Sequence, residues 1–136
     1  MKLLIISIQF LFLNIIHGQD TLNLRFIDAT NVYNNHVGNE WAFVTFIGEN
    51  LLNLGDAINI IYDSLDDSFE LVAAIQEGRE IHNDSNTKQF VMTFRELFNN
   101  YRKGFNIEID LREGHGRYAG NLALWKFHYE LKFKPK

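Results

Sequence analysis

The chain has 136 residues, of which 46% are hydrophobic, and it contains no cysteine. The missing thiols exclude disulfides, thiolate metal sites, iron–sulfur clusters and cysteine nucleophiles. With 17 acidic against 13 basic residues and no basic stripe, the net charge of −4 argues against a nucleic-acid partner.

The first eighteen residues have the pattern of a secretory signal peptide. The basic residue Lys2 precedes an apolar run from Leu3 to Ile16, and the small residue Gly18 closes the segment. The run is shorter than the roughly 20 apolar residues that cross a bilayer as a helix, so we expect no transmembrane segment. We therefore predict cleavage after Gly18 and a secreted, extracellular chain in which residues 19–136 form a single domain.

Alternation of apolar and polar residues with a period of two predicts strands along most of this domain. In chain order, the expected strands are 22–26, 41–47, 57–62, 69–77, 89–94, 105–112 and 123–135. The expected connectors, rich in polar and turn-forming residues, are 31–39, 48–56, 63–68 and 82–88. We interpret 63–68 as a hairpin connection between the strands that flank it.

The last two strands give the strongest signal. Residues 105–112 and 123–135 alternate strictly, and the glycine-rich segment 113–120 between them predicts a hairpin with a loose tip. The lysines at 126, 132 and 134 fit either a sheet edge guarded against mispairing or a central strand with one wet face.

One segment could instead be helical. Thr93 and Glu96 have the spacing of a capping box, and apolar residues follow on one helical face, so 94–103 is either a short helix or a continued strand. Residues 69–77 combine helix formers with alternation, and we favour a strand there. The expected fold is thus a single all-β antiparallel sandwich of about seven or eight strands, with room for one short helix near 94–103; two helices would make the class α+β.

The segment Trp41–Ile47 is apolar on both faces of its expected strand. A helix or a long loop that covers the outer face is the interpretation we favour. The alternative is an exposed apolar surface that binds a lipid, a hydrophobic ligand or a second subunit.

The densest acidic stretch runs from Asp63 to Glu70. Clustered carboxylates can bind calcium, so Asp63, Asp66 and Asp67 form a weak candidate calcium site. The stretch lacks the EF-hand glycine and terminal glutamate, and a solvated loop is the favoured interpretation.

No catalytic motif is apparent. The histidines at 36, 82, 115 and 128 have no metal-ligand spacing, and the serines have no nucleophile-elbow setting. A catalytic pairing of His115 with Glu113 stays open, since such groups can assemble from anywhere in the chain. We expect a non-enzymatic protein that needs no cofactor.

Long polar connectors on a rigid scaffold are a common place for binding residues. We therefore expect a secreted, non-enzymatic module that recognises an extracellular protein or carbohydrate through its loops. The candidate contact residues are Tyr33, His36, His115, Arg117 and Tyr118. Two alternatives stand beside it: a carrier or sensor of a hydrophobic ligand or lipid, and, ranked lower, a hydrolase with a dispersed site.

Asn83 begins the sequence Asn83-Asp84-Ser85, an acceptor motif for N-linked glycan in a hydrophilic connector. If a eukaryotic host secretes the protein with this glycan, enzymatic deglycosylation will lower its intact mass. Deglycosylation that leaves the mass unchanged would contradict glycosylation at Asn83.

Overall fold

A computed structural model describes residues 19–78 and 84–135. In these residues the chain forms eight strands and one short helix. Their bounds are β1 (Asp20–Asn34), β2 (Trp41–Ile47), β3 (Asn50–Leu52), β4 (Ala57–Tyr62), β5 (Ser68–Glu77), β6 (Asp84–Thr93), α1 (Phe94–Asn100), β7 (Gly104–Arg112) and β8 (Leu122–Lys134). The expected all-β sandwich with one short helix is confirmed.

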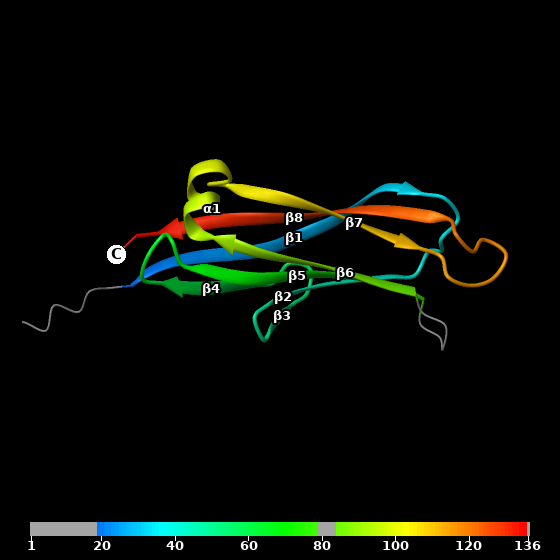
Figure 1. Cartoon of the computed structure of the whole chain (residues 1–136), viewed down its shortest axis with the longest axis horizontal. Coiled ribbons are helices and arrows are strands. Elements are labelled where there is room, and N and C mark those ends of the chain that lie inside the picture. Colours follow the sequence, from blue (N-terminus) through cyan, green and yellow to red (C-terminus); the bar gives the residue numbers. More distant parts are fainter. Residues whose placement is uncertain (1–18, 79–83, 136) are drawn as a thin grey trace, which may run out of the picture.

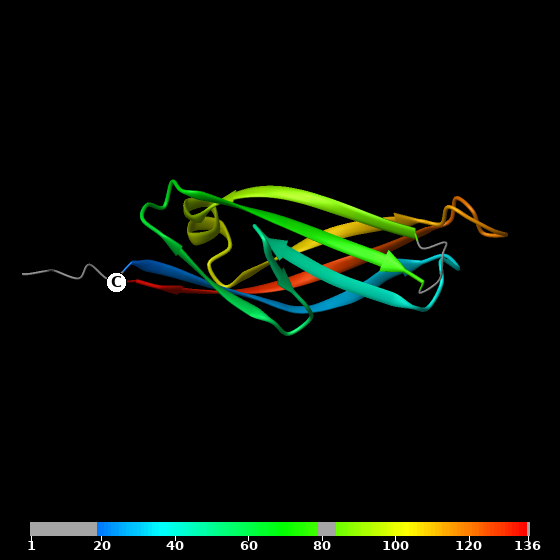
Figure 2. The same ribbon diagram turned by 90° about the horizontal axis from the view of Figure 1, so that it is seen from below.

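The strands form two four-stranded antiparallel sheets that lie face to face (Figures 1 and 2). The first sheet has the order β4-β1-β8-β7, and the second has the order β3-β2-β5-β6. The expected C-terminal hairpin is present, with Gly104 paired to Glu130 and Arg112 paired to Leu122. Strand β8 also pairs with β1 on its other side, so it is central and its lysines do not guard an edge.

The alternation along each strand decides which side chains enter the core. Leu22, Leu24 and Phe26 of β1 are buried, as are Phe127 and Tyr129 of β8. Successive strand residues point to opposite faces, so the residues between them turn outward. The first sheet consequently has a polar outer face, on which His128 Nδ1 lies 2.7 Å from Asn106 Oδ1.

Aromatic rings join the two sheets. Phe43 of β2 lies 4.6 Å from Trp125 and 5.7 Å from Phe127 of β8, measured between ring centroids. Trp41 lies 5.1 Å from Trp125. Tilted and edge-on ring pairs of this kind add to the free energy gained by burial alone.

The helix closes one end of the sandwich. Thr93 caps it by accepting a hydrogen bond from the backbone N–H of Glu96, as the capping-box spacing predicts. Its first residue, Phe94, stacks on Tyr62 of the first sheet at 4.2 Å and contacts Phe69 of the second sheet at 5.3 Å. The helix ends at Asn100, three residues before the expected end.

Several expected boundaries are wrong. Strand β1 continues to Asn34 because it pairs with β8 through two register shifts, and β6 begins at Asp84 because its polar half pairs with β5. The three-residue strand β3 lies inside an expected connector. Strands β4 and β5 belong to different sheets, so the segment between them crosses the sandwich and is not a hairpin connection.

A buried hydrogen bond of 2.7 Å joins Thr45 Oγ1 of one sheet to the Tyr129 hydroxyl of the other. Replacing Thr45 by Val should lower the free energy of unfolding by about 1–3 kcal/mol, because the tyrosine hydroxyl is then buried without a partner. Adding Tyr129→Phe should recover most of this loss, as measured by urea denaturation of the two single variants and the double variant. Strictly additive losses would show that the two groups do not interact.

Candidate functional site

The outer face of the second sheet is apolar and uncovered. On β2, Ala42 and Phe46 are exposed while Trp41, Phe43 and Thr45 point inward. Phe46 pairs across the sheet with Leu51, which is also exposed, and with Val72. The favoured interpretation of this strand, a covering helix or loop, is therefore wrong, since α1 closes the end of the sandwich instead (Figure 2).

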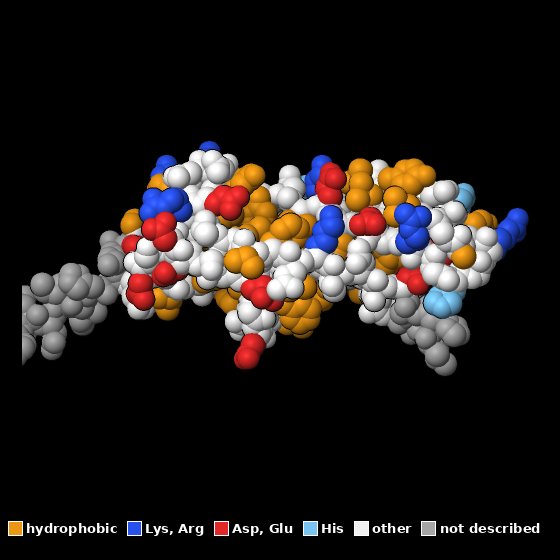
Figure 3. Space-filling model, viewed as in Figure 1, with side chains coloured by type: hydrophobic (Ala, Val, Ile, Leu, Met, Phe, Trp, Pro, Cys, Tyr) orange, Lys and Arg blue, Asp and Glu red, His pale blue; other side chains and the backbone are white. Residues whose placement is uncertain are grey.

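An apolar groove lies where the edges of the two sheets diverge. Strand β6 is the edge of one sheet and β7 the edge of the other. Toward the loops, Asn86 Nδ2 and Lys88 Nζ of β6 donate to the β7 carbonyls of Asp110 at 2.6 Å and Glu108 at 2.7 Å. Beyond these bonds, the edges and α1 enclose a groove of about 240 Å³. Figure 3 shows hydrophobic side chains at the surface beside the helix, between these strands.

The lining of the groove comes from all three elements. It consists of Phe90, Val91, Met92, Glu96, Leu97, Tyr101, Phe105, Asn106 and Ile107. Leu97, Phe105 and Ile107 form a buried floor, and Tyr101, 44% exposed, stands at the rim. Glu96 is the charged member of this set, so the groove is an apolar trough with an acidic rim.

The predicted contact residues gather at the opposite end of the sandwich. The His36 ring stacks on Tyr118 with a centroid separation of 5.2 Å, and the Arg117 guanidinium lies 5.7 Å from the same ring. The loops around 35–40 and 113–121 therefore lie side by side (Figure 1), which the sequence left open. His36 adopts a φ of +58°, a left-handed conformation that is uncommon outside glycine. Tyr33 is exposed near the end of β1, on the same side.

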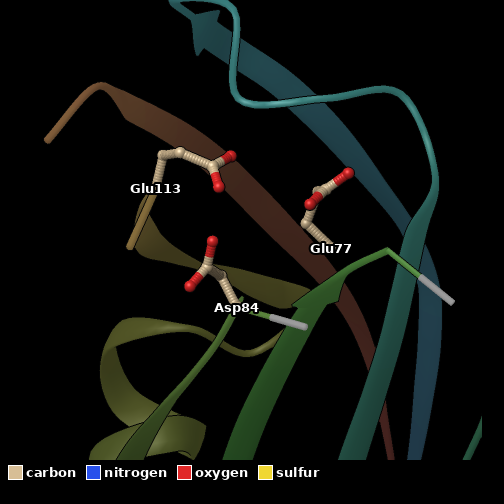
Figure 4. A group of neighbouring side chains, drawn as sticks. All are labelled: Glu77, Asp84 and Glu113. Atoms are coloured by element: carbon tan, nitrogen blue, oxygen red, sulfur yellow. The ribbon is translucent and has the colours of Figure 1, made fainter. Parts of the chain in front are cut away.

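Three carboxylates meet at the same end, and sequence reasoning missed them as a group. Glu77 ends β5, Asp84 begins β6, and Glu113 follows β7. One carboxylate oxygen of each lies within 4.8 Å of the others, and Figure 4 shows the three side chains converging. Glu77 and Asp84 are paired across neighbouring strands, but a contact between residues 77 and 113 has no local signature in the sequence.

Their surroundings shift the pKa values in opposite directions. Burial, followed by the charges of Asp84 and Glu40, raises the pKa of Glu77. Burial and then the hydrogen bond and charge of Asp84 raise the pKa of Glu113. Burial also favours a protonated Asp84, but hydrogen bonds from Gly114 N–H and Glu113, with the charge of His115, outweigh it and lower the pKa of Asp84.

The candidate calcium residues have local partners. Arg95 forms a two-pronged ion pair with Asp66, at 2.8 and 3.3 Å, which lowers the pKa of the Asp66 carboxyl. Asp67 Oδ2 accepts hydrogen bonds from the backbone N–H groups of Asp63 and Ser64, both at 3.1 Å. Within residues 19–78 and 84–135, the one group with metal-ligand spacing is Glu77, Asp84 and Glu113, so calcium at 63–67 stays a prediction.

The remaining candidates fall in two groups. His115 lies 3.5 Å from Asp84, so its carboxylate partner includes a residue other than the Glu113 considered from sequence. The signal peptide, His82 and the glycan acceptor Asn83 lie outside the described residues. In the described part of the chain, no helix has the length and hydropathy needed to cross a membrane.

No protein-family model and no curated protein matches the sequence. Among solved structures, the chain is similar to a C2 domain of plant extended synaptotagmin 1, with 11% sequence identity and a TM-score of 0.44. The match covers 85% of this chain and 95% of that domain.

This comparison contradicts the main functional prediction from the sequence. The matched structure is a C2 domain of a synaptotagmin and not a secreted module that recognises a protein or carbohydrate. The prediction of such a module is therefore wrong, and its alternative, a binder of a hydrophobic ligand or lipid, takes its place.

Proposed function

We propose that the protein is a non-enzymatic binder of a neutral apolar ligand, such as a single-chain lipid, and that the groove between β6, α1 and β7 holds it. The observation that carries the proposal is the lining of this groove, in which apolar side chains from three elements surround a trough open to solvent. Ligand sites are typically concave, mostly apolar and supplied with few polar groups.

The size of the groove limits the ligand. Its volume of about 240 Å³ lies just below the range of roughly 300–1,000 Å³ typical of drug-sized ligands. The groove therefore suits a short alkyl chain or one end of a longer chain, with the remainder extending into solvent. Because Phe105 and Ile107 are already buried in the floor, the ligand would gain apolar contact without a rearrangement of the sandwich.

The charge of the rim favours a neutral head group. Glu96 contributes a carboxylate, and the lining contains no lysine, arginine or histidine. A fatty-acid carboxylate next to Glu96 would meet a like charge without a compensating cation. An alcohol, an ester or an amide would avoid this repulsion and could hydrogen-bond to Asn106 or Glu96.

Secretion belongs to the proposal and rests on the sequence of residues 1–18. A secreted protein with this groove would carry or sense an apolar molecule outside the cell. A domain without disulfides is suited to this task in any redox environment, because nothing in its core depends on oxidation.

Tyr101 and Tyr118 provide a matched test of the groove. They are exposed to similar extents, 44% and 42%, but Tyr101 lines the groove while Tyr118 lies at the loop end. Tyr101→Ala should weaken the binding of decanol about tenfold, which corresponds to a loss of ~1.4 kcal/mol, because one wall of the groove is removed. Tyr118→Ala should leave the affinity unchanged. Titration by native mass spectrometry measures both; equal losses in the two variants would refute this site.

The rim charge gives a second test. At neutral pH the wild type should bind decanol more tightly than decanoic acid, and Glu96→Gln should narrow this difference by improving decanoate binding. Glu70→Gln, an exposed substitution on β5 away from the groove, serves as the control. A wild type that prefers decanoate would contradict the assignment of a neutral ligand.

A further inference from the structure

The three-carboxylate cluster bridges the two sheets at the loop end. Glu77 and Asp84 belong to the second sheet, whereas Glu113 starts the loop that joins β7 to β8 of the first sheet. Gly114 N–H donates to Asp84 Oδ2 at 3.0 Å, and His115 lies 3.5 Å from Asp84 Oδ1. Asp84 is thus the point at which the β7–β8 loop is attached to the opposite sheet (Figure 4).

Two glycines make room for the carboxylates. A Cβ atom on Gly114 would approach Asp84 Oδ1 to 2.7 Å, and a Cβ atom on Gly38 would overlap the carboxylate of Glu77. Gly38 also has a φ of +125°, which side-chain-bearing residues rarely adopt. The loops at 35–40 and 113–121 therefore pack directly against the acidic side chains, with no side chain between them.

We propose that the cluster is an acid-closed latch: a proton shared between Glu113 and Asp84 holds the β7–β8 loop against the β5–β6 end, and loss of that proton at higher pH releases the loop. The proposal concerns the loop end and is independent of the ligand groove at the other end of the sandwich.

The electrostatic reason is that three carboxylates so close together cannot all ionise without repulsion. With Glu113 protonated, its hydroxyl donates to the ionised Asp84, which also accepts from Gly114. When Glu113 ionises, this donor becomes a second negative charge beside Asp84 and Glu77. Such a pair titrates as one unit, so the group that loses the proton is the Glu113–Asp84 pair.

The neighbouring charged groups act in the same direction. Glu40 adds negative charge near Glu77, and a protonated His115 neutralises part of the charge on Asp84. The Arg112 guanidinium donates to the Gly120 carbonyl at 2.9 Å. Acidification therefore removes repulsion at Glu77 and Glu113 and adds attraction at His115.

The sign of the effect on stability follows from the pKa directions. The raised pKa values of Glu77 and Glu113 mean that their stabilising contribution is full below the ordinary glutamate pKa and is lost as the pH rises through the raised values. The lowered pKa of Asp84 means that its contribution is lost only as the pH falls through that lowered value. The latch is strongest in the window between them.

The Gly114 amide is a direct reporter, because its hydrogen bond to Asp84 exists only in the closed latch. In NMR hydrogen exchange, its protection factor, corrected for intrinsic exchange, should fall about tenfold from mildly acidic to weakly alkaline buffer, as expected for a free-energy change worth one pKa unit. In Glu113→Gln, a neutral side chain that still donates, the acidic-buffer protection should persist in alkaline buffer. Glu49→Gln, in the exposed β2–β3 turn, should behave as the wild type.

Three outcomes would overturn the proposal. The first is a wild-type protection factor that does not depend on pH, and the second is a Glu113→Gln variant that loses protection as the wild type does. The third is full protection in alkaline buffer on addition of millimolar calcium, which would show that a cation and not a proton neutralises the cluster. If Glu113→Gln does not fold, Glu77→Gln replaces it and should raise alkaline protection by removing one of the three charges.

Discussion

The two sheets are held together by packing between their inner faces, since the chain has no cysteine to cross-link them. The rings of Phe43, Trp125 and Phe127 form the centre of this contact. Beside them, the hydrogen bond between Thr45 and Tyr129 satisfies two hydroxyls that burial would otherwise penalise. Burial raises the pKa of Tyr129, so its hydroxyl stays neutral and the bond persists at physiological pH. Every surface feature depends on this contact, because it fixes the separation and the orientation of the sheets.

The same contact accounts for the ligand groove. Packing is densest along β1, β2 and β8, and the sheets diverge at the β6 and β7 edges, where side-chain bonds from Asn86 and Lys88 reach across only part of the gap. The remaining gap would expose Leu97, Phe105 and Ile107 if α1 did not partly cover it. The helix therefore has two effects: Phe94 completes the core, and Glu96 and Tyr101 form the rim of the groove.

The two ends of the sandwich differ in chemistry because they close in different ways. At one end, Phe94 links Tyr62 of one sheet to Phe69 of the other through ring contacts that no pH change disturbs. At the other end, loops meet through carboxylates, a histidine and glycine backbone, whose interactions depend on ionisation. A sandwich built in this way can keep an apolar site rigid at one end while its loops respond to acidity at the other.

The sequence by itself determined the strands, the C-terminal hairpin and the helix cap, because these depend on neighbouring residues: alternation along Ala123–Phe133 and the Thr93–Glu96 spacing are local patterns. It also marked Trp41–Ile47 as unusual but could not decide whether its outer face was covered. Only the tertiary structure placed β8 at the centre of a sheet, separated β4 from β5, and left Phe46 exposed. It alone brought Glu77, Asp84 and Glu113 together, since loop contacts between distant residues depend on how the two sheets pack and leave no periodic trace in the chain.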